Sequence, residues 1–131
     1  MGYKLSSRSA GRLHKPETHP DIIKVVERAI ELTEVDFGIS QTVRTIEQQE
    51  ENVRKGVSKT MKSRHIPSSN ASGMCEAVDV YAWVDGGVSW DAEYYHQIAD
   101  AFKEAANELD IEITWGGDWK SFFDGPHFQL G

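Results

Sequence analysis

The stretch Ala-Val-Asp-Val-Tyr-Ala-Trp at residues 77–83 has the period-two alternation that is typical of a β-strand. Side chains alternate between the two faces of a strand, so Asp79 points to one face while Val78 and Val80 point to the other. The turn sequence Asp-Gly-Gly at residues 85–87 ends the segment. We therefore predict a strand that can bury its valines on one side and present a carboxylate on the other.

Patterns on both sides of this strand predict helices and further short strands. A helix is expected to begin at Pro20, which suits the first helical position, and Thr45 with Gln48 forms a capping box. The expected helices lie at about 20–35, 45–54 and 91–109, and the expected strands at 37–40, 112–115 and 127–130. Residues 1–17 are expected to form a polar N-terminal arm, and residues 56–76 a long loop. This pattern predicts an α+β fold, with helices packed against a small antiparallel sheet.

The composition limits the classes of function that are open to the chain. Its 131 residues fit one domain, expected to span 1–131. Asp and Glu number 21 against 14 Lys and Arg, and the net charge of −7 argues against nucleic-acid binding, which depends on neutralising phosphates. No apolar run approaches the ~20 residues of a membrane span, and residues 1–6 lack the apolar core of a signal peptide, so no stable membrane association is expected. The single cysteine, Cys75, rules out an internal disulfide and is compatible with synthesis in a reducing cytosol.

Two histidines and an aspartate stand where a metal site could be built. His65 lies in the predicted loop, Asp79 on the strand that follows it, and His127 at the start of the last predicted strand. Two imidazoles and one carboxylate, with a fourth position left for water, form a ligand set that suits a catalytic zinc. A structural role is the alternative for a histidine on a short strand, and the residues alone leave that alternative open.

Asp124 lies three residues before His127, and the intervening Gly125-Pro126 can turn the chain and bring the two side chains together. A carboxylate beside a zinc site can take a proton from water and pass it to a leaving amine. The alternative is that Asp124 only opens a turn.

His96 and Asp100, one helical turn apart, form a second potential metal pair, for which an exposed helical pair without metal is the favoured interpretation.

Three motifs of the chain resemble the zinc motifs of the VanY-type D-alanyl-D-alanine carboxypeptidases and of the related phage L-alanyl–D-glutamate endopeptidases. These motifs are Ser63-Arg64-His65, Ala77-Val78-Asp79 and Asp124-Gly125-Pro126-His127-Phe128. The resemblance also takes in His19-Pro20, Val43-Arg44-Thr45 and Gly116-Gly117-Asp118-Trp119, and so covers most of residues 19–130. It implies the zinc peptidase fold shared by the D-alanyl-D-alanine peptidases and the hedgehog signalling domains.

The resemblance implies a role for each matched residue. His65, Asp79 and His127 would hold Zn²⁺, and Asp124 would act as general base and then as general acid. Arg44 would lie near the site, where a guanidinium can anchor a substrate carboxylate or stabilise an oxyanion. A structural ion pair is the alternative for Arg44.

The chain departs from the family pattern between the first two metal ligands. In the family the histidine and the aspartate are seven positions apart, whereas residues 65 and 79 are 14 positions apart, and Cys75 stands where the family has glycine. Cys75 and Glu76 are therefore alternative ligands to Asp79. Asp118 is a lesser alternative to Asp124.

The resemblance implies a zinc metallopeptidase that hydrolyses the stem peptides of bacterial peptidoglycan at the L-alanyl–D-glutamate bond, as a phage endolysin in host cell lysis. A D-alanyl-D-alanine carboxypeptidase with the same zinc site is one alternative. A non-catalytic, zinc-stabilised binding domain of the same fold is another. Without a signal peptide, the protein is expected to be made in the host cytoplasm, to act as a monomer and to reach the cell wall once the membrane is permeabilised.

Overall fold

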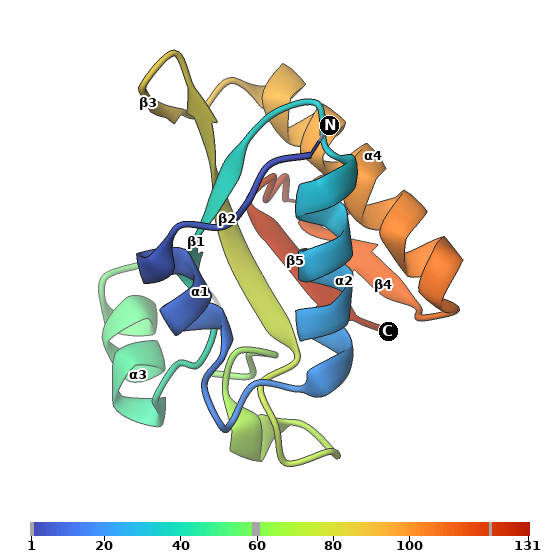
Figure 1. Cartoon of the computed structure of the whole chain (residues 1–131). Helices are drawn as coiled ribbons and strands as arrows, with labels where there is room; N and C mark the ends of the chain where they lie inside the picture. The colour runs from blue at the N-terminus through green and yellow to red at the C-terminus, as the bar shows by residue number, and fades with distance from the viewer. Residues whose placement is uncertain (1, 59–60, 121) are drawn as a thin grey trace.

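The structure is a computed structural model that describes residues 2–58, 61–120 and 122–131 (Figure 1). The helices are α1 (Ser7–Leu13), α2 (Pro20–Leu32), α3 (Ile46–Arg54) and α4 (Ala92–Leu109), with short 3-10 helices η1 (Pro67–Ser69) and η2 (Gly116–Asp118). The strands are β1 (Phe37–Gln41), β2 (Ala77–Val84), β3 (Gly87–Ser89), β4 (Ile113–Trp115) and β5 (His127–Leu130). The predicted helices and strands are all present, although α2 ends at Leu32 because Thr33 is already extended.

The strands form one antiparallel sheet in the order β1-β2-β5-β4, and β3 pairs with β2 outside this path. The predicted α+β class with a small antiparallel sheet is confirmed. The pairing of β2 with β5 places Asp79 directly opposite His127. On the other side of β2, the pairing with β1 places Gln41 opposite Asp79, with a bulge between Ile39 and Gln41. The sheet therefore collects polar side chains from three strands around Asp79.

Helices α2 and α4 lie side by side over one face of the sheet, and the core fills the space between these layers (Figure 1). Val78 and Val80 point into this core and are fully buried, as the alternation of β2 predicted. The ring of Phe102 from α4 stacks on that of Phe128 from β5, with 3.8 Å between ring centroids. Because α2 and α4 cover this face, the functional side chains of β2 and β5 can only lie on the opposite face.

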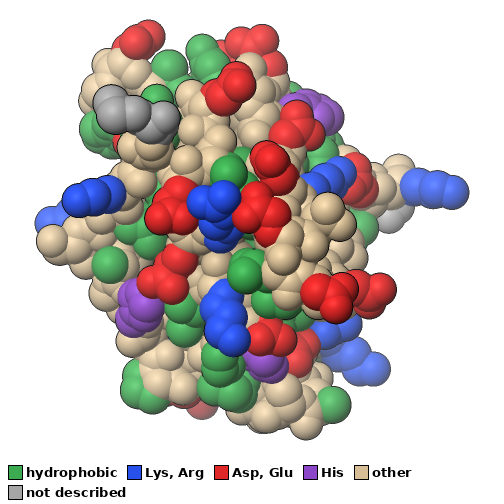
Figure 2. All heavy atoms as spheres, turned by 45° about the vertical axis from the view of Figure 1, so that its right-hand side comes forward, with side chains coloured by type: hydrophobic (Ala, Val, Ile, Leu, Met, Phe, Trp, Pro, Cys, Tyr) green, Lys and Arg blue, Asp and Glu red, His purple; other side chains and the backbone are tan. Residues whose placement is uncertain are grey.

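The outer surface of α2 and α4 carries a mixture of acidic and basic side chains (Figure 2). An ion pair between Arg28 of α2 and Glu108 of α4 joins the two helices there, with 2.9 Å between Nε and Oε1. Exposed pairs of this kind contribute little to the stability of a fold, so the apolar core holds the helices on the sheet.

Helix α1 was not predicted, because its sequence Ser-Arg-Ser-Ala-Gly-Arg-Leu has no helical stripe of apolar residues. It forms because Ser6 caps its first turn by accepting a hydrogen bond from the Ser9 amide, and because Leu13 is fully buried. The Ser9 hydroxyl in turn accepts a hydrogen bond from the Ile39 amide of β1. The predicted polar arm of residues 1–17 is thus partly a helix that covers the outer edge of the sheet.

The long loop of residues 56–76 is ordered in its second half by one side chain. The Asn70 amide donates to the carbonyl oxygens of Arg64 and Met74, each at 2.8 Å, and so ties together the two ends of the segment. At the base of the loop, the Cys75 amide donates to the Glu17 carbonyl, and the His19 amide donates to the Cys75 carbonyl. The additional residues relative to the family pattern therefore form a closed loop beside β2.

The stacked pair at the centre of the core gives a test of this packing. Phe102→Ala should lower the free energy of unfolding by about 3–5 kcal/mol, because it removes a buried ring and leaves a cavity. Leu109→Ala, in the same helix but at a side chain that is 38% exposed, should change it by less than about 1 kcal/mol. Urea denaturation followed by circular dichroism would measure both, and equal losses would contradict the assigned core.

Candidate metal centre

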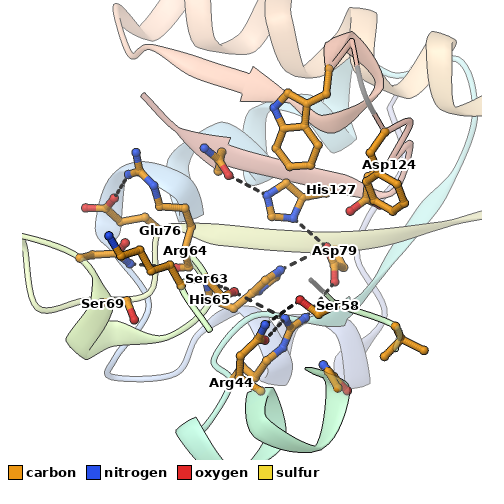
Figure 3. A pocket seen from close by; sticks show the side chains of 18 of the residues that line it. Arg44, Ser58, Ser63, Arg64, His65, Ser69, Glu76, Asp79, Asp124 and His127 are labelled. Carbon is orange, nitrogen blue, oxygen red and sulfur yellow. Dashed lines mark hydrogen bonds and ion pairs between the residues drawn. The ribbon is translucent and has the colours of Figure 1, made fainter. Parts of the chain in front are cut away.

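Three side chains that sequence analysis predicted as metal ligands converge on the open face of the sheet (Figure 3). His65 comes from the segment before η1, Asp79 from β2 and His127 from β5. One ligand atom of each lies within 4.8 Å of those of the other two. His65 is 2% exposed and His127 7% exposed. Such a group of two imidazoles and one carboxylate could hold a metal ion.

Hydrogen bonds to the outer nitrogen fix each imidazole. His65 Nδ1 donates to the backbone carbonyl of Thr42 at 2.7 Å, which leaves Nε2 directed at Asp79. His127 Nε2 lies 2.9 Å from the side-chain oxygen of Gln129, which leaves Nδ1 directed at Asp79. In metal sites a ligating histidine almost always donates its second N–H to such an acceptor, because that bond sets the tautomer and the ring orientation. Both histidines therefore direct their inner nitrogen, the one that a metal ion would take, toward the same carboxylate.

Asp79 is the common partner of both rings. Its Oδ1 lies 3.2 Å from His65 Nε2 and 3.2 Å from His127 Nδ1. Burial on its own would raise the pKa of Asp79, but the hydrogen bonds and positive charge offered by the two histidines outweigh it and hold the pKa well below its usual range. Burial would lower the pKa of His127, and the hydrogen bond and charge of Asp79 raise it instead. Asp79 is thus an anion that would neutralise part of the charge of a bound cation.

Asp124 lies at the end of the loop that leads into β5, and it lines the same cleft as Asp79 and His127 (Figure 3). Its backbone carbonyl accepts the His127 amide at 3.2 Å, so Gly125-Pro126 makes the turn that the sequence predicted. Burial, followed by the neighbouring charge of Asp79, raises the pKa of Asp124. A partly buried carboxyl with a raised pKa beside a cleft is suited to exchange protons.

Gly116 lets the loop bring Asp124 to this position. The Asp124 amide donates to the Gly116 carbonyl at 3.1 Å, and a Cβ added at Gly116 would collide with the Asp124 backbone oxygen and would lie 2.9 Å from its Cβ. Only glycine allows the two segments to approach so closely. Asp124 is therefore held by the backbone on both sides, through Gly116 and through His127.

Arg44 lies just outside β1, with its guanidinium directed toward Asp79 (Figure 3). Nη2 is 3.6 Å from Asp79 Oδ2, and the Arg44 side chain is only 13% exposed. The guanidinium also donates to the side-chain oxygens of Gln41, at 2.7 Å from Nη2, and Gln49, at 2.8 Å from Nη1. The structure thus shows the ion pair that the sequence left open as an alternative, and it also places Arg44 in the lining of the cleft.

The cleft around these residues has a volume of about 1110 Å³. That volume slightly exceeds the range of about 300–1,000 Å³ typical of small-molecule sites, and it suits an extended peptide. The ring of Trp119 covers one side of His127, with 5.2 Å between ring centroids. On the opposite side, the cleft runs toward α3 and the loop that contains η1. The metal group therefore lies at the floor of an open groove.

The side chains that the sequence offered as alternatives to Asp79 and Asp124 have other partners. Cys75 is fully buried with its thiol donating to the Ala77 carbonyl, and burial raises the pKa of this thiol to about 11. Glu76 accepts hydrogen bonds from Arg64 and Ser72. The carboxylate of Asp118 pairs with Lys103 of α4 at 2.8 Å. None of these three is in the metal group found among the described residues.

The other potential metal pair is not part of the metal group found among the described residues. His96 and Asp100 are both on the exposed side of α4. The imidazole of His96 instead packs edge-on against the ring of Trp115, with 4.9 Å between centroids.

The sequence suggested Ser63 as a residue that could orient a ligand, and its hydroxyl accepts a hydrogen bond from the His65 amide, but Thr42 and Gln129, which bond the two imidazole rings, were not assigned this role. Gln129 could have been found, because it lies two residues after His127 and so shares its face of the strand. The carbonyl of Thr42 carries no side-chain signal, because any residue at that position would supply the same acceptor. The two glutamines that hold Arg44 come from β1 and α3, and nothing in their sequence context marks them.

Comparisons with known proteins agree on one family. The sequence profile described as phage L-alanyl-D-glutamate peptidase matches residues 1–130. The L-alanyl-D-glutamate peptidase of Escherichia phage T5 is 30% identical over 99% of this chain and 99% of its own length. That of Listeria phage A118 is 36% identical over 73% of this chain and 31% of its own length. The crystal structure of the L-Ala D-Glu endopeptidase ChiX from Serratia marcescens matches 98% of this chain and 90% of its own, with a TM-score of 0.85 and 42% identity.

The metal content of two variants would distinguish Asp79 from Cys75, the alternative ligand in the loop. Asp79→Ala should lose bound metal, because it removes the carboxylate between the two imidazoles. Cys75→Ser should retain it, because the smaller hydroxyl can still donate to the Ala77 carbonyl. Elemental analysis of the purified, folded variants would measure both. Metal retained by Asp79→Ala and lost by Cys75→Ser would move the ligand into the loop.

Proposed function

The chain belongs to the phage L-alanyl-D-glutamate peptidase family, and on this basis we propose that it cleaves peptidoglycan stem peptides with a zinc ion held by His65, Asp79 and His127. The observation that carries the proposal is the convergence of the three ligand atoms within 4.8 Å. Peptidase activity on the L-alanyl–D-glutamate bond follows from the family. The metal and the role of each residue are the parts that we propose.

The donor set fits zinc. Two neutral imidazole nitrogens and one carboxylate oxygen are typical protein ligands of a catalytic zinc, which keeps a further position open to the substrate side. The outer nitrogens of both imidazoles already have acceptors, in Thr42 and Gln129, so the inner nitrogens, which point at Asp79, are the ones available to a metal ion. Zinc in such a site supplies a Lewis acid that polarises a carbonyl and lowers the pKa of water toward ~7.

Asp124 is the residue that moves the proton. Its carboxylate accepts a proton from the attacking water as the water adds to the peptide carbonyl. The protonated Asp124 then donates this proton to the departing nitrogen of D-glutamate, so that the amine leaves as the C–N bond breaks. The raised pKa of Asp124 suits both steps, because a group whose pKa lies closer to neutral pH can both accept and donate a proton there. No covalent bond between enzyme and substrate is needed.

The proposed role of Arg44 is to orient Asp79 and to add positive charge to the site. Its guanidinium is held by Gln41 and Gln49, and it stands beside Asp79 at the edge of the cleft. A cation fixed in this way orients the Asp79 carboxylate and adds positive charge where the carbonyl oxygen becomes negative. The geometry supports this combined role more than capture of a distant substrate carboxylate.

We also propose how the protein reaches its substrate. Within the described residues, no helix is long and apolar enough to cross a membrane. The proposed route is synthesis in the host cytoplasm, release when the membrane is permeabilised, and action on the wall as a monomer. Residues 1–131 would serve as one catalytic domain.

Removal of the metal should abolish activity and lower stability. If free zinc is present at about 100 times its dissociation constant, its loss costs about 2.7 kcal/mol of folding free energy. For a domain of this size, that corresponds to a fall in melting temperature of roughly 10 °C. A chelator followed by added zinc, with calorimetry and hydrolysis of purified peptidoglycan as readouts, tests this. Full activity after complete removal of metal would contradict zinc dependence.

Asp124→Asn tests the proton transfer. The amide keeps the size and turn of Asp124 but cannot accept a proton, so hydrolysis should fall by ~10²–10⁴-fold. Metal content and melting temperature should stay close to those of the wild type. Mass spectrometry of the peptidoglycan fragments that the wild type releases should show new N-terminal D-glutamate and no free D-alanine.

The matched control is Asp118→Asn, because Asp118 lies in the same region of the chain and pairs with Lys103 on the surface. This variant should keep nearly full activity. If Asp124→Asn also kept full activity, Asp124 would be only a turn residue. If it lost metal together with activity, Asp124 would be a ligand.

A further inference from the structure

A second hollow lies on the same open face of β2 as the metal group. Side chains alternate along a strand, so Tyr81 and Trp83 share a face with Asp79. At about 3.3 Å per residue, Tyr81 stands about 7 Å and Trp83 about 13 Å further along the strand. The peptide cleft extends from Asp79 in the other direction, toward Glu76 and the loop that contains η1. The two aromatic rings therefore continue the line of the cleft beyond the metal group.

The hollow has a volume of about 240 Å³ and combines aromatic and polar groups. Its lining includes the aromatic side chains of Tyr81 and Trp83 and the polar groups of Lys4, Ser6 and Asp36. This volume is somewhat below the ~300–1,000 Å³ of complete small-molecule sites. It therefore suits one ring of a longer ligand whose remainder lies outside.

Contacts within the sheet hold the two aromatic side chains of this lining in place. The ring of Tyr81 lies directly against Gly38 on the neighbouring strand, where a Cβ would collide with it. Gly38 therefore leaves room for the hydroxyl end of this ring over β1. The Trp83 ring meets the Tyr81 ring edge-on, with 6.5 Å between centroids, and Trp83 remains 44% exposed. Adjoining apolar side chains that are exposed and rimmed by polar residues are typical of a ligand-binding groove, whereas a single exposed apolar side chain is not.

We propose that this hollow is a subsite for an N-acetylated sugar ring of the glycan strand to which the stem peptide is attached. This inference rests on the proposed function and extends it from the peptide to the carbohydrate. A pyranose ring offers a face of C–H groups that packs on aromatic rings, while its hydroxyl and acetamido groups form hydrogen bonds at the edges. Tyr81 and Trp83 supply the aromatic surface, and Lys4, Ser6 and Asp36 supply donors and acceptors.

The position of the hollow agrees with the chemistry of the substrate. The L-alanine of the scissile bond is joined through its nitrogen to the lactyl group of the sugar. One residue and a lactyl group separate the reacting carbonyl from the ring, which is about two residue lengths, or roughly 7 Å. Positions 79 and 81 are separated along β2 by about the same distance, two residues at about 3.3 Å each. The stem peptide beyond D-glutamate would then occupy the larger cleft on the other side.

The kinetic test compares two substrates that differ only in the sugar. They are the stem tetrapeptide with a lactyl group on its N-terminal nitrogen, here called the free peptide, and the same peptide attached through that lactyl group to its disaccharide. Trp83→Ala should lower the ratio of kcat/KM on the disaccharide-peptide to kcat/KM on the free peptide by about 3- to 10-fold, mostly through KM, because it removes an aromatic contact. Trp90→Ala is the matched control: Trp90 is also exposed and near β3, but its ring stacks on Tyr95 instead. It should leave this ratio unchanged.

A binding measurement makes the proposal independent of catalysis. The peptide-free disaccharide of N-acetylglucosamine and N-acetylmuramic acid is titrated into the zinc-loaded protein, and the four tryptophan indole N–H signals are followed by NMR. The signal that is lost in Trp83→Ala should be the one that shifts most. A shift at Trp119 alone, no shift at any indole, or an unchanged substrate ratio in Trp83→Ala would each overturn the subsite. Sugar binding at Trp83 without peptide hydrolysis by the wild type would instead reject the proposed function and leave the subsite standing.

Discussion

Strand β2 pairs with β5 in the register that sets Asp79 opposite His127, and this register positions the site. A shift by one residue would turn Asp79 toward α2 and α4 and expose the valines on either side of it. The apolar contacts of Val78 and Val80 with the helices prevent that shift. The burial of ordinary core residues on one face of β2 therefore fixes the metal group on the other.

The remaining parts of the site are attached to this strand pair by the backbone. The Arg44 amide donates to the carbonyl of His65 at 3.0 Å, which joins the end of β1 to the loop that carries the first ligand. The Val80 amide of β2 donates to the carbonyl of Pro126, so the turn after Asp124 is bonded to the same strand. Backbone bonds hold geometry more closely than long surface side chains do, and a catalytic group must lie within about 0.5 Å of its working position. The site is thus arranged before any substrate enters.

Much of this arrangement could be predicted from the sequence, for reasons that are specific to each element. Period-two alternation identified the face of β2 that carries Asp79, and Gly125-Pro126 indicated the turn that brings Asp124 back to His127. Helix α1 could not be predicted, because its stability comes from contacts with β1 and the core and not from its own periodicity. The acceptor for His65 is a backbone carbonyl, and the clamp on Arg44 comes from residues distant in the sequence; neither leaves a local pattern. The additional residues before Asp79 left Cys75 and Glu76 as alternatives in the sequence, and only the path of the loop shows that neither is in the group that could hold a metal ion.

The buried thiol has a consequence for the environment in which such an enzyme works. Peptidoglycan lies outside the cytoplasmic membrane, where no glutathione pool keeps cysteines reduced. Oxidation and disulfide exchange proceed through the thiolate and require access to the sulfur. Cys75 has neither property, because it is fully buried under the base of the loop and its thiol stays protonated at neutral pH. A protein folded in a reducing compartment can therefore pass into an oxidising one without forming mixed disulfides or covalent dimers.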